Sequence, residues 1–144
     1  MPPRGERVTP LVVLAVAIAG GLGAVARLVL DGVLRSRAPV SFPLGTTAIN
    51  VTGSFVLGLV TALALGHGLP PEWRAILGTG FIGGYTTFST ASYEAVRLAQ
   101  QRQYRAALLT GVGMMFLALG AAGLGLWLGG LAVAPTPPAP STTL

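Results

Sequence analysis

Four stretches of mostly apolar residues follow one another along the chain, separated by short polar or Pro/Gly-rich connections. The first, second and fourth cover residues 11–34, 44–66 and about 106–132. The third, from about Trp73 to Leu98, is richer in Gly, Ser and Thr. A helix needs roughly 20 apolar residues to cross the hydrocarbon core of a bilayer. The pattern therefore predicts an all-α integral membrane protein with four transmembrane helices.

The polar ends set the limits of this membrane unit. We expect residues 1–10 to form a polar tail, residues 11–132 a four-helix transmembrane domain, and residues 133–144 a disordered tail rich in Pro, Ser and Thr. A cleaved signal peptide is a weaker interpretation of the first stretch. The apolar pattern continues past Gly20 and Gly21, and no small-x-small cleavage site precedes a polar segment.

Composition supports a lipid environment and excludes several classes of function. The chain is 52% hydrophobic and only 9% charged, whereas a soluble domain carries about a quarter charged residues. Its net charge of +5 comes from scattered arginines, without the basic stripe and stacking aromatic residues of a nucleic-acid binder. Cysteine is absent, and no acid–base pair lies near a candidate nucleophile, so we expect no enzyme.

Arginine placement gives a weak indication of orientation. With four spans, both termini lie on one side of the membrane, and we expect a multi-pass protein of the cell membrane. The first and third loops carry five arginines, against three in the N-terminal tail and second loop. This bias points the odd loops toward the cytoplasm. So small a bias fits a chain that inserts in both orientations, and equally a sequence that leaves orientation undecided.

Polar residues recur along one face of the second stretch. Thr46, Asn50 and Ser54 are four residues apart, and Thr61 follows Ser54 by seven, a spacing that places them on one side of a helix. An uncharged row of amide and hydroxyl donors suits the passage of a small anion. The same groups also bond across packed helices. Periodicity leaves both interpretations open.

The third stretch favours an ion site more specifically. Gly80, Gly83 and Gly84 lie beside the hydroxyl-rich residues 85–90, and this composition weakens a helix. A helix broken at membrane depth frees backbone groups that protein, water or ions must satisfy, and transporters bind ions at such breaks. Gly80 and Gly84 could instead serve close helix packing. Packing alone does not require so many hydroxyl groups, so we favour the ion site.

Arg27 lies inside the first stretch, one helical turn before Asp31. It could form an ion pair with Asp31 near the interface, with its guanidinium extended to the headgroups. It could equally place a positive charge in an aqueous vestibule and so concentrate anions.

Three motifs together resemble the CrcB/Fluc family of fluoride channels. They are GGLGAVAR at residues 20–27, GTTAINVTGSF at 45–55 and GFIGGYTTFST at 80–90. Their order and spacing match the family from the first stretch to the fourth. The resemblance implies a fluoride-specific channel that exports fluoride passively from the cytoplasm and lowers its toxicity.

The same resemblance implies a dual-topology antiparallel dimer with two pores at the subunit interface. A structural sodium ion would lie at the centre of that interface, held by the backbone carbonyls of Gly83 and Thr86 from a broken third helix. The partners of the chain would be fluoride, the lipid bilayer and a second subunit, either identical or homologous. We expect no nucleic acid among them.

Carried over by position, several residues would line the fluoride path. Asn50 would be the pore amide, Arg27 the vestibule charge, and Phe88 the ring whose positive edge meets fluoride. Ser89 and Thr90 would add hydroxyl groups beside that ring.

Three residues further along the sequence differ from the family pattern, and one matches it. Ala91 stands where a second Phe is common, and in the fourth helix Thr110 keeps a polar position while Met114 and Ala118 do not. The path contributed by this chain is therefore poorer in polar groups, and the chain could be one half of a heterodimeric channel.

A small multidrug transporter and an accessory membrane subunit are the remaining alternatives. The transporter needs a carboxylate within the membrane for proton exchange. The only acids in the four stretches are Asp31, near the end of the first, and Glu94, late in the third. This placement argues against the transporter, whereas a subunit without transport of its own stays open.

Overall fold

A computed structural model describes residues 9–37 and 44–133, which are helical apart from short connections. The predicted polar tail up to residue 8, the loop at 38–43 and the predicted disordered tail from residue 134 lie outside the described residues. The elements follow in the order α1 (Pro10–Arg37), α2 (Leu44–His67), α3 (Pro71–Arg74), the π-helical η1 (Ala75–Ile82), α4 (Gly83–Tyr85), α5 (Phe88–Gln100), α6 (Tyr104–Leu108), the π-helical η2 (Leu109–Gly113) and α7 (Met114–Ala132).

Three helical stretches are long and apolar enough to cross a membrane, judged by length and composition. They are Pro10–Arg37, Leu44–Gly66 and the continuous run Tyr104–Ala132. The first continues through Arg37, beyond its predicted end at residue 34, and an ion pair between Arg35 and Asp31 one turn earlier supports this last turn. The third apolar stretch of the sequence is also helical, but it is interrupted after α4.

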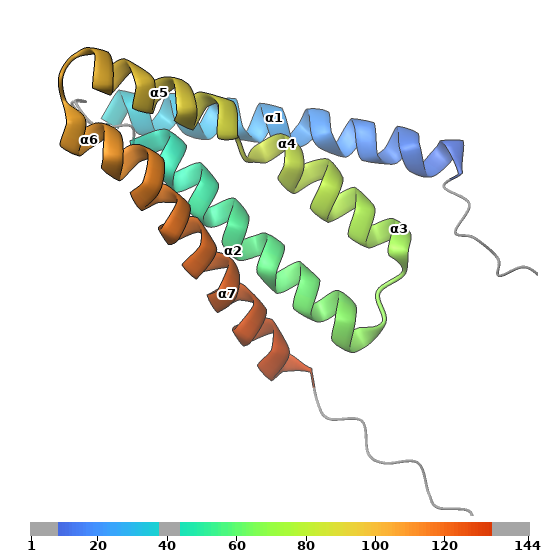
Figure 1. Cartoon of the computed structure of the whole chain (residues 1–144). Helices are drawn as coiled ribbons and strands as arrows, with labels where there is room; N and C mark the ends of the chain where they lie inside the picture. Colours follow the sequence, from blue (N-terminus) through green and yellow to red (C-terminus); the bar gives the residue numbers. More distant parts are fainter. Residues whose placement is uncertain (1–8, 38–43, 134–144) are drawn as a thin grey trace, which may run out of the picture.

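Helix α2 packs along α7 through glycine (Figure 1). A Cβ atom built on Gly58 would collide with the Ala122 carbonyl, and one on Gly125 would collide with the Phe55 carbonyl. Each helix thus presents a glycine to the backbone of the other. Such small residues let two membrane helices approach closely enough for extensive van der Waals contact.

Helix α1 packs against η1 and α4 in the same way. A Cβ atom on Gly23 would meet the Phe81 carbonyl, and one on Gly84 would meet the Gly20 carbonyl. A Cβ atom on Gly80 would lie only 2.9 Å from the Val16 carbonyl oxygen. The close-packing interpretation of Gly80 and Gly84 is therefore confirmed, because both glycines occupy the contact with α1.

The large apolar side chains lie mostly on the outside of the chain. Half or more of the surface of side chains such as Leu11, Leu28, Leu65, Phe116 and Leu131 is exposed. The interior is built from small and polar residues, with Ala19, Ala62 and Thr46 among the buried ones. This arrangement is the reverse of a soluble core and suits a protein surrounded by lipid and by other helices.

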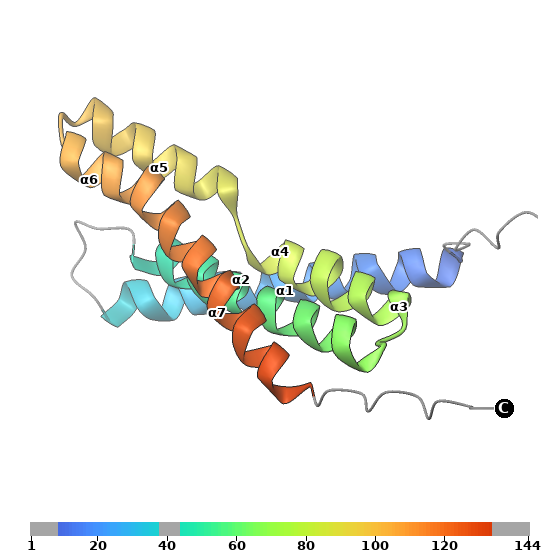
Figure 2. The ribbon, with the colours of Figure 1, turned by 60° about the horizontal axis from the view of Figure 1, so that its bottom comes forward.

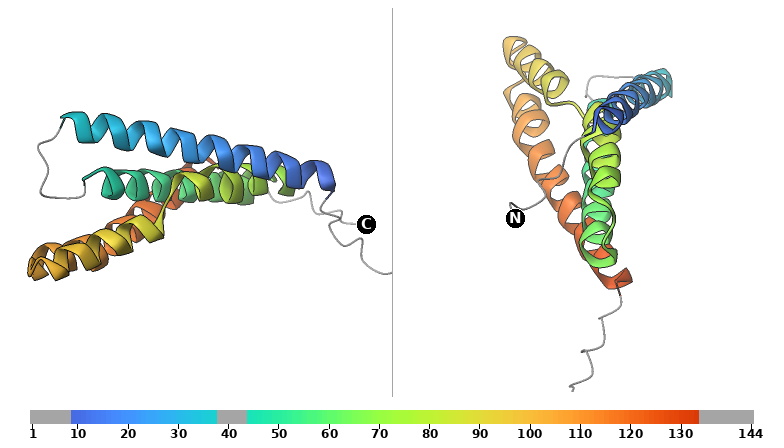
Figure 3. Two further views of the ribbon diagram at one scale, coloured as in Figure 1. Left: turned by 90° about the horizontal axis from the view of Figure 1, so that it is seen from above. Right: turned by 90° about the vertical axis from the view of Figure 1, so that its right-hand side faces the viewer.

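After the interruption the chain changes direction and forms a hairpin. Helix α5 leads away from α4, and α6 with the start of η2 returns alongside it, so that the hairpin projects at one end of the molecule (Figure 2). Figure 3 shows α1 on one side of α2 and this hairpin on the other. The connection between α4 and α5 therefore sets the direction in which the hairpin projects.

Candidate functional site around the broken helix

The helix breaks at Thr86 and Thr87, at the C-terminal end of the predicted break from Gly83 to Thr86. Gly83 and Gly84 are helical in α4, whereas Thr86 (φ −80°, ψ 158°) and Thr87 (φ −148°, ψ 118°) are extended. Thr87 then caps α5, because its hydroxyl oxygen accepts from the Thr90 amide at 3.2 Å. The composition indicated the region in which the helix is least stable. The backbone leaves the helical conformation only where other hydrogen-bond partners replace the helical ones.

Asn50 of α2 supplies those partners. The Thr87 amide donates to Asn50 Oδ1 at 2.8 Å, and Asn50 Nδ2 donates to the Thr87 carbonyl at 2.9 Å. Both residues are buried, with 7% and 8% of their surface exposed. One side-chain amide thus satisfies both backbone groups of a buried, extended residue, which would be costly to leave unpaired. The polar stripe on α2 includes a contact between helices at this residue.

The break redirects two amide groups away from the carbonyls predicted to hold sodium. In an uninterrupted helix, the Thr87 amide would donate to the Gly83 carbonyl and the Thr90 amide to the Thr86 carbonyl. Here the first donates to Asn50 and the second to the Thr87 hydroxyl. Both carbonyls lie where a half-helix ends, and the partial negative charge there suits a cation.

Gly83 differs from its neighbours in having open space around it. The nearest atom to a Cβ built on Gly83 is the Gly78 carbonyl oxygen of the same helical stretch, at 3.8 Å. Gly80 and Gly84 face α1 instead. Contacts within the described chain therefore explain the absence of a side chain at Gly80 and Gly84, and they do not explain it at Gly83.

The hydroxyl groups predicted for the anion path gather beside Thr87. The Thr87 hydroxyl donates to Thr90 Oγ1 at 3.0 Å and lies 3.3 Å from Ser89 Oγ. Phe88, between Thr87 and these residues, has 86% of its surface exposed. The ring therefore projects away from the described chain, and Ser89 is exposed on the same first turn of α5.

Two residues of the fourth apolar stretch, Met114 and Thr110, also belong to the candidate site. Asn50 Nδ2 donates to Met114 Sδ at 3.5 Å, a distance within the range for a sulfur acceptor. Thr110, one helical turn earlier in η2, is fully buried, and its hydroxyl has no hydrogen-bond partner among the described residues. The structure thus brings together Asn50, the break and Met114, with Thr110 four residues away on the same helix.

Arg27 does not join this group, and it does not pair with Asp31 in the described chain. Asp31 Oδ2 is bound by Arg35 Nε at 2.9 Å instead, and Arg35 Nη2 lies 3.6 Å from Glu94 Oε1. The Arg27 Nε atom is buried without a hydrogen-bond partner among the described residues. The ion-pair interpretation of Arg27 is therefore wrong in this structure. The two acids of the four stretches share one arginine.

Thr87 is the site residue that sequence reasoning missed. Two signals pointed to it: a buried Asn side chain in a membrane helix needs a partner, and a Thr before a polar helical turn is a common cap. Neither signal identifies which of the two threonines at the break meets Asn50, because that depends on how α2 lies against the break.

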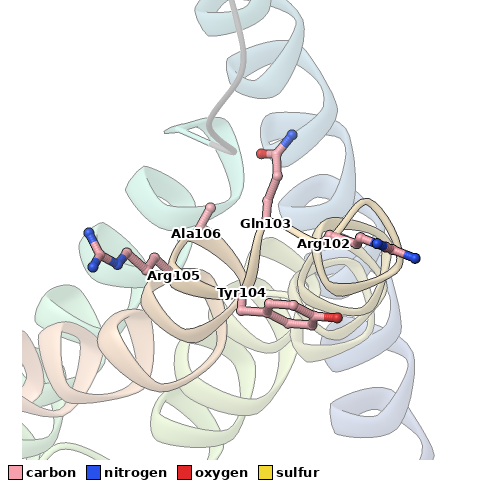
Figure 4. Close-up of a pocket in the computed structure, with 5 residues that line it drawn as sticks. All are labelled: Arg102, Gln103, Tyr104, Arg105 and Ala106. Carbon is pink, nitrogen blue, oxygen red and sulfur yellow. The ribbon is translucent and has the colours of Figure 1, made fainter.

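A shallow pocket also lies at the turn between α5 and α6, lined by Arg102 to Ala106. Arg102 adopts a left-handed conformation (φ 60°) there. Arg102 and Arg105 extend to opposite sides of the turn, with Tyr104 between them (Figure 4). The two guanidinium groups do not converge on one point, so we place the candidate site at the break.

Comparisons with known proteins identify the family of the chain. The family model described as CrcB-like protein, Camphor Resistance (CrcB), matches residues 14–126. The fluoride-specific ion channel FluC 2 of Cutibacterium acnes is 52% identical over 120 residues, covering 83% of this chain and 98% of the relative. The fluoride-specific ion channel FluC of Acidobacterium capsulatum is 44% identical over 122 residues (84% and 98%), and that of Thermococcus gammatolerans 45% over 109 residues (74% and 85%).

Proposed function

Because the chain belongs to the CrcB-like family, we propose that it is a fluoride-specific ion channel and not an enzyme. Relatives named as fluoride-specific ion channels match it over most of their length. Fluoride leaves the cytoplasm passively through this channel, which lowers its toxicity to the cell. The observation that carries the proposal is a broken helix whose backbone is hydrogen-bonded to Asn50 and lies beside several hydroxyl groups. The rest of the chain exposes mainly apolar side chains, as a protein surrounded by lipid does.

The channel crosses the cell membrane four times. The three long apolar helices provide three crossings, and the two half-helices at residues 71–85 and 88–100 together provide the remaining one. The chain inserts in both orientations, with which the weak arginine bias is compatible, and two copies associate antiparallel. The break supports this proposal, since irregular backbone at membrane depth is tolerated only where protein or an ion covers it.

A second subunit covers the open side of the break. Gly83 is exposed and has free space around it, and Ser89 and Phe88 are exposed beside it. Lipid tails cannot satisfy the carbonyls at the end of α4. A partner subunit with the same break can satisfy these groups, and glycine at position 83 allows the two backbones to approach.

The carbonyls of Gly83 and Thr86 hold a structural sodium ion at the centre of this interface. The fit of these residues rests on the redirected Thr87 and Thr90 amides, which leave main-chain oxygen atoms at a helix end. When bound, sodium neutralises the carbonyl dipoles of both subunits. Without a cation, four such dipoles near one axis would repel one another.

The fluoride path runs beside the break. Asn50 and Thr110 contribute buried donors, Ser89 and Thr90 contribute hydroxyl groups, and the Phe88 ring faces the partner subunit. Arg27, whose Nε atom is buried and unpaired among the described residues, supplies the positive charge of the vestibule. Hydrogen-bond donors without a fixed charge in the narrow part let a small anion shed its water and leave again.

A heterodimeric pair is the second candidate. Met114 and Ala118 place apolar side chains on the helix that carries Thr110, so a homologous subunit could supply the missing polar groups. Several relatives carry a number in their names, such as FluC 2 and FluC 3, which suits genomes with more than one such chain. The multidrug alternative is disfavoured, because the two acids of the apolar stretches, Asp31 and Glu94, both lie within ion-pair distance of the same arginine, Arg35, near the end of α1.

Fluoride efflux from liposomes that contain only this purified chain tests the proposal. We expect fluoride efflux without matching chloride efflux, and less of it when sodium is replaced by potassium or a large organic cation. If the chain alone gives no fluoride efflux and a co-reconstituted homologue restores it, the heterodimer is the correct form. No fluoride efflux from either preparation, with the chain folded and inserted, would overturn the channel proposal.

A further inference from the structure

Every donor of the Asn50 amide is already engaged in this structure. Its Nδ2 atom donates to the Thr87 carbonyl at 2.9 Å and to Met114 Sδ at 3.5 Å. A primary amide carries two N–H groups and therefore has no third donor to offer. A fluoride ion that binds this amide must first displace one of the two acceptors.

The two acceptors differ in how readily they can be displaced. The Thr87 carbonyl belongs to the buried main chain at the break, and the amide of the same residue donates back to Asn50 Oδ1. Losing it would undo both hydrogen bonds at that residue. The thioether of Met114 is a weak acceptor on a flexible, unbranched side chain. Met114 is therefore the acceptor that moves.

A donor without an acceptor among the described residues lies one helical turn before Met114. Thr110, four residues earlier, is fully buried, and its hydroxyl lacks a hydrogen-bond partner in the described chain. An unpartnered hydroxyl without access to water is costly in a protein interior, and a small anion would accept from it. Thr110 and Met114 share one face of their helix because they are four residues apart, so an ion that replaced the thioether beside Asn50 would lie on the same face as the Thr110 hydroxyl.

We propose that Met114 gates the fluoride path by acting as a removable acceptor. In this structure its thioether accepts from the second N–H of Asn50, one helical turn from Thr110. When fluoride arrives, the side chain of Met114 rotates away and the ion takes its place between the two donors. This inference rests on the proposed function. It gives a role to a residue that, from sequence alone, only interrupts the polar row of the fourth helix.

The test compares Met114→Leu with Met115→Leu in the purified full-length chain. Leucine keeps an apolar side chain of similar volume at position 114, so folding is preserved, but it cannot accept a hydrogen bond. Met115 is 55% exposed and provides the same substitution outside the path. The side-chain ¹⁵N–¹H signals of Asn50 are recorded without fluoride and through a sodium fluoride titration, and efflux from liposomes is measured alongside.

In Met114→Leu, we expect the Asn50 side-chain signal to move before any fluoride is added. The fluoride concentration at half-saturation should fall roughly two- to tenfold, the factor for one weak hydrogen bond that need not be broken. Efflux should rise, and Met115→Leu should match the parent in every measurement. Equal signals and equal titrations in Met114→Leu and the parent would overturn the gate. If Asn50 in the parent does not respond to fluoride at all, its proposed place in the path is wrong, and this inference falls with it.

Discussion

Replacing Asn50 with leucine should destabilise the chain by removing the side chain that holds the break. Leucine has a similar size, so packing changes little, but it neither donates nor accepts. The Thr87 amide and carbonyl, now 2.8 and 2.9 Å from their partners on Asn50, would lose both hydrogen bonds. They would remain buried, because Thr87 has only 8% of its surface exposed.

The size of the effect follows from how far the main chain can repair itself. A buried donor or acceptor without a partner costs about 1–3 kcal/mol, so two such groups set an upper range of about 2–6 kcal/mol. Hydrogen bonds between membrane helices average only about 0.6 kcal/mol when measured, which sets a lower limit near 1 kcal/mol. Repair would require residues 86 and 87 to become helical. Thr86 and Tyr85 are packed against Gly53 of α2, which opposes that movement, so we expect a loss of about 2–4 kcal/mol.

Denaturant unfolding of the purified protein, combined with hydrogen exchange at Thr87, measures this loss. The matched control is Thr61→Val on the same helix, because the Thr61 hydroxyl donates only to the Leu57 carbonyl one turn earlier, at 2.8 Å. The control should stay within about 0.5 kcal/mol of the parent. If Asn50→Leu is as stable as the parent and the Thr87 amide exchanges equally slowly, Asn50 does not hold the break.

Three further substitutions separate the roles of neighbouring residues, and a fourth tests the turn between α5 and α6. Asn50→Asp should abolish fluoride efflux from liposomes, because an ionised carboxylate accepts hydrogen bonds and repels an anion; efflux equal to the parent would remove Asn50 from the path. Gly84→Val should unfold the chain itself, since its side chain would collide with the Gly20 carbonyl. Gly83→Val should leave the chain helical by circular dichroism but weaken dimerisation in detergent, and a dimer of parental strength would show that Gly83 is not at the interface. Arg102→Gly should raise the free energy of unfolding by roughly 1 kcal/mol, because Arg102 has φ 60° and glycine adopts this conformation without strain; an unchanged midpoint would contradict this.

The membrane helices could be predicted from sequence because their signal is local. An apolar stretch of sufficient length specifies a buried helix in lipid whatever lies elsewhere in the chain. The bounds of the first helix were nevertheless too short at residue 34, because the Arg35–Asp31 ion pair that supports the last turn resembles an ordinary polar connection in the sequence. Charged residues mark the end of the apolar stretch and do not mark the end of the helix.

The position of the break could be predicted only to within a few residues, because its exact place depends on a distant residue. Glycine and hydroxyl residues showed that the helix near Gly83 is weak, yet Gly80 and Gly84 remain helical and pack against α1. The backbone leaves the helix where Asn50, 37 residues earlier, replaces the helical partners of Thr87. Helix propensity indicates the region in which a helix can break. The residue at which it breaks is determined here by a long-range hydrogen bond.

Met114 shows a further limit of counting polar residues along a predicted path. In the sequence it interrupts a row of hydroxyl and amide positions, so the path looks incomplete. In the structure its sulfur accepts from the same amide that holds the break, and the buried hydroxyl of Thr110 lies one turn away on the same helix. A residue type that neither carries a charge nor donates can therefore still determine when a donor is available. The chemistry of such a path depends on which acceptor each donor has before the ion arrives, and only the three-dimensional arrangement of Asn50, Thr110 and Met114 supplies that information.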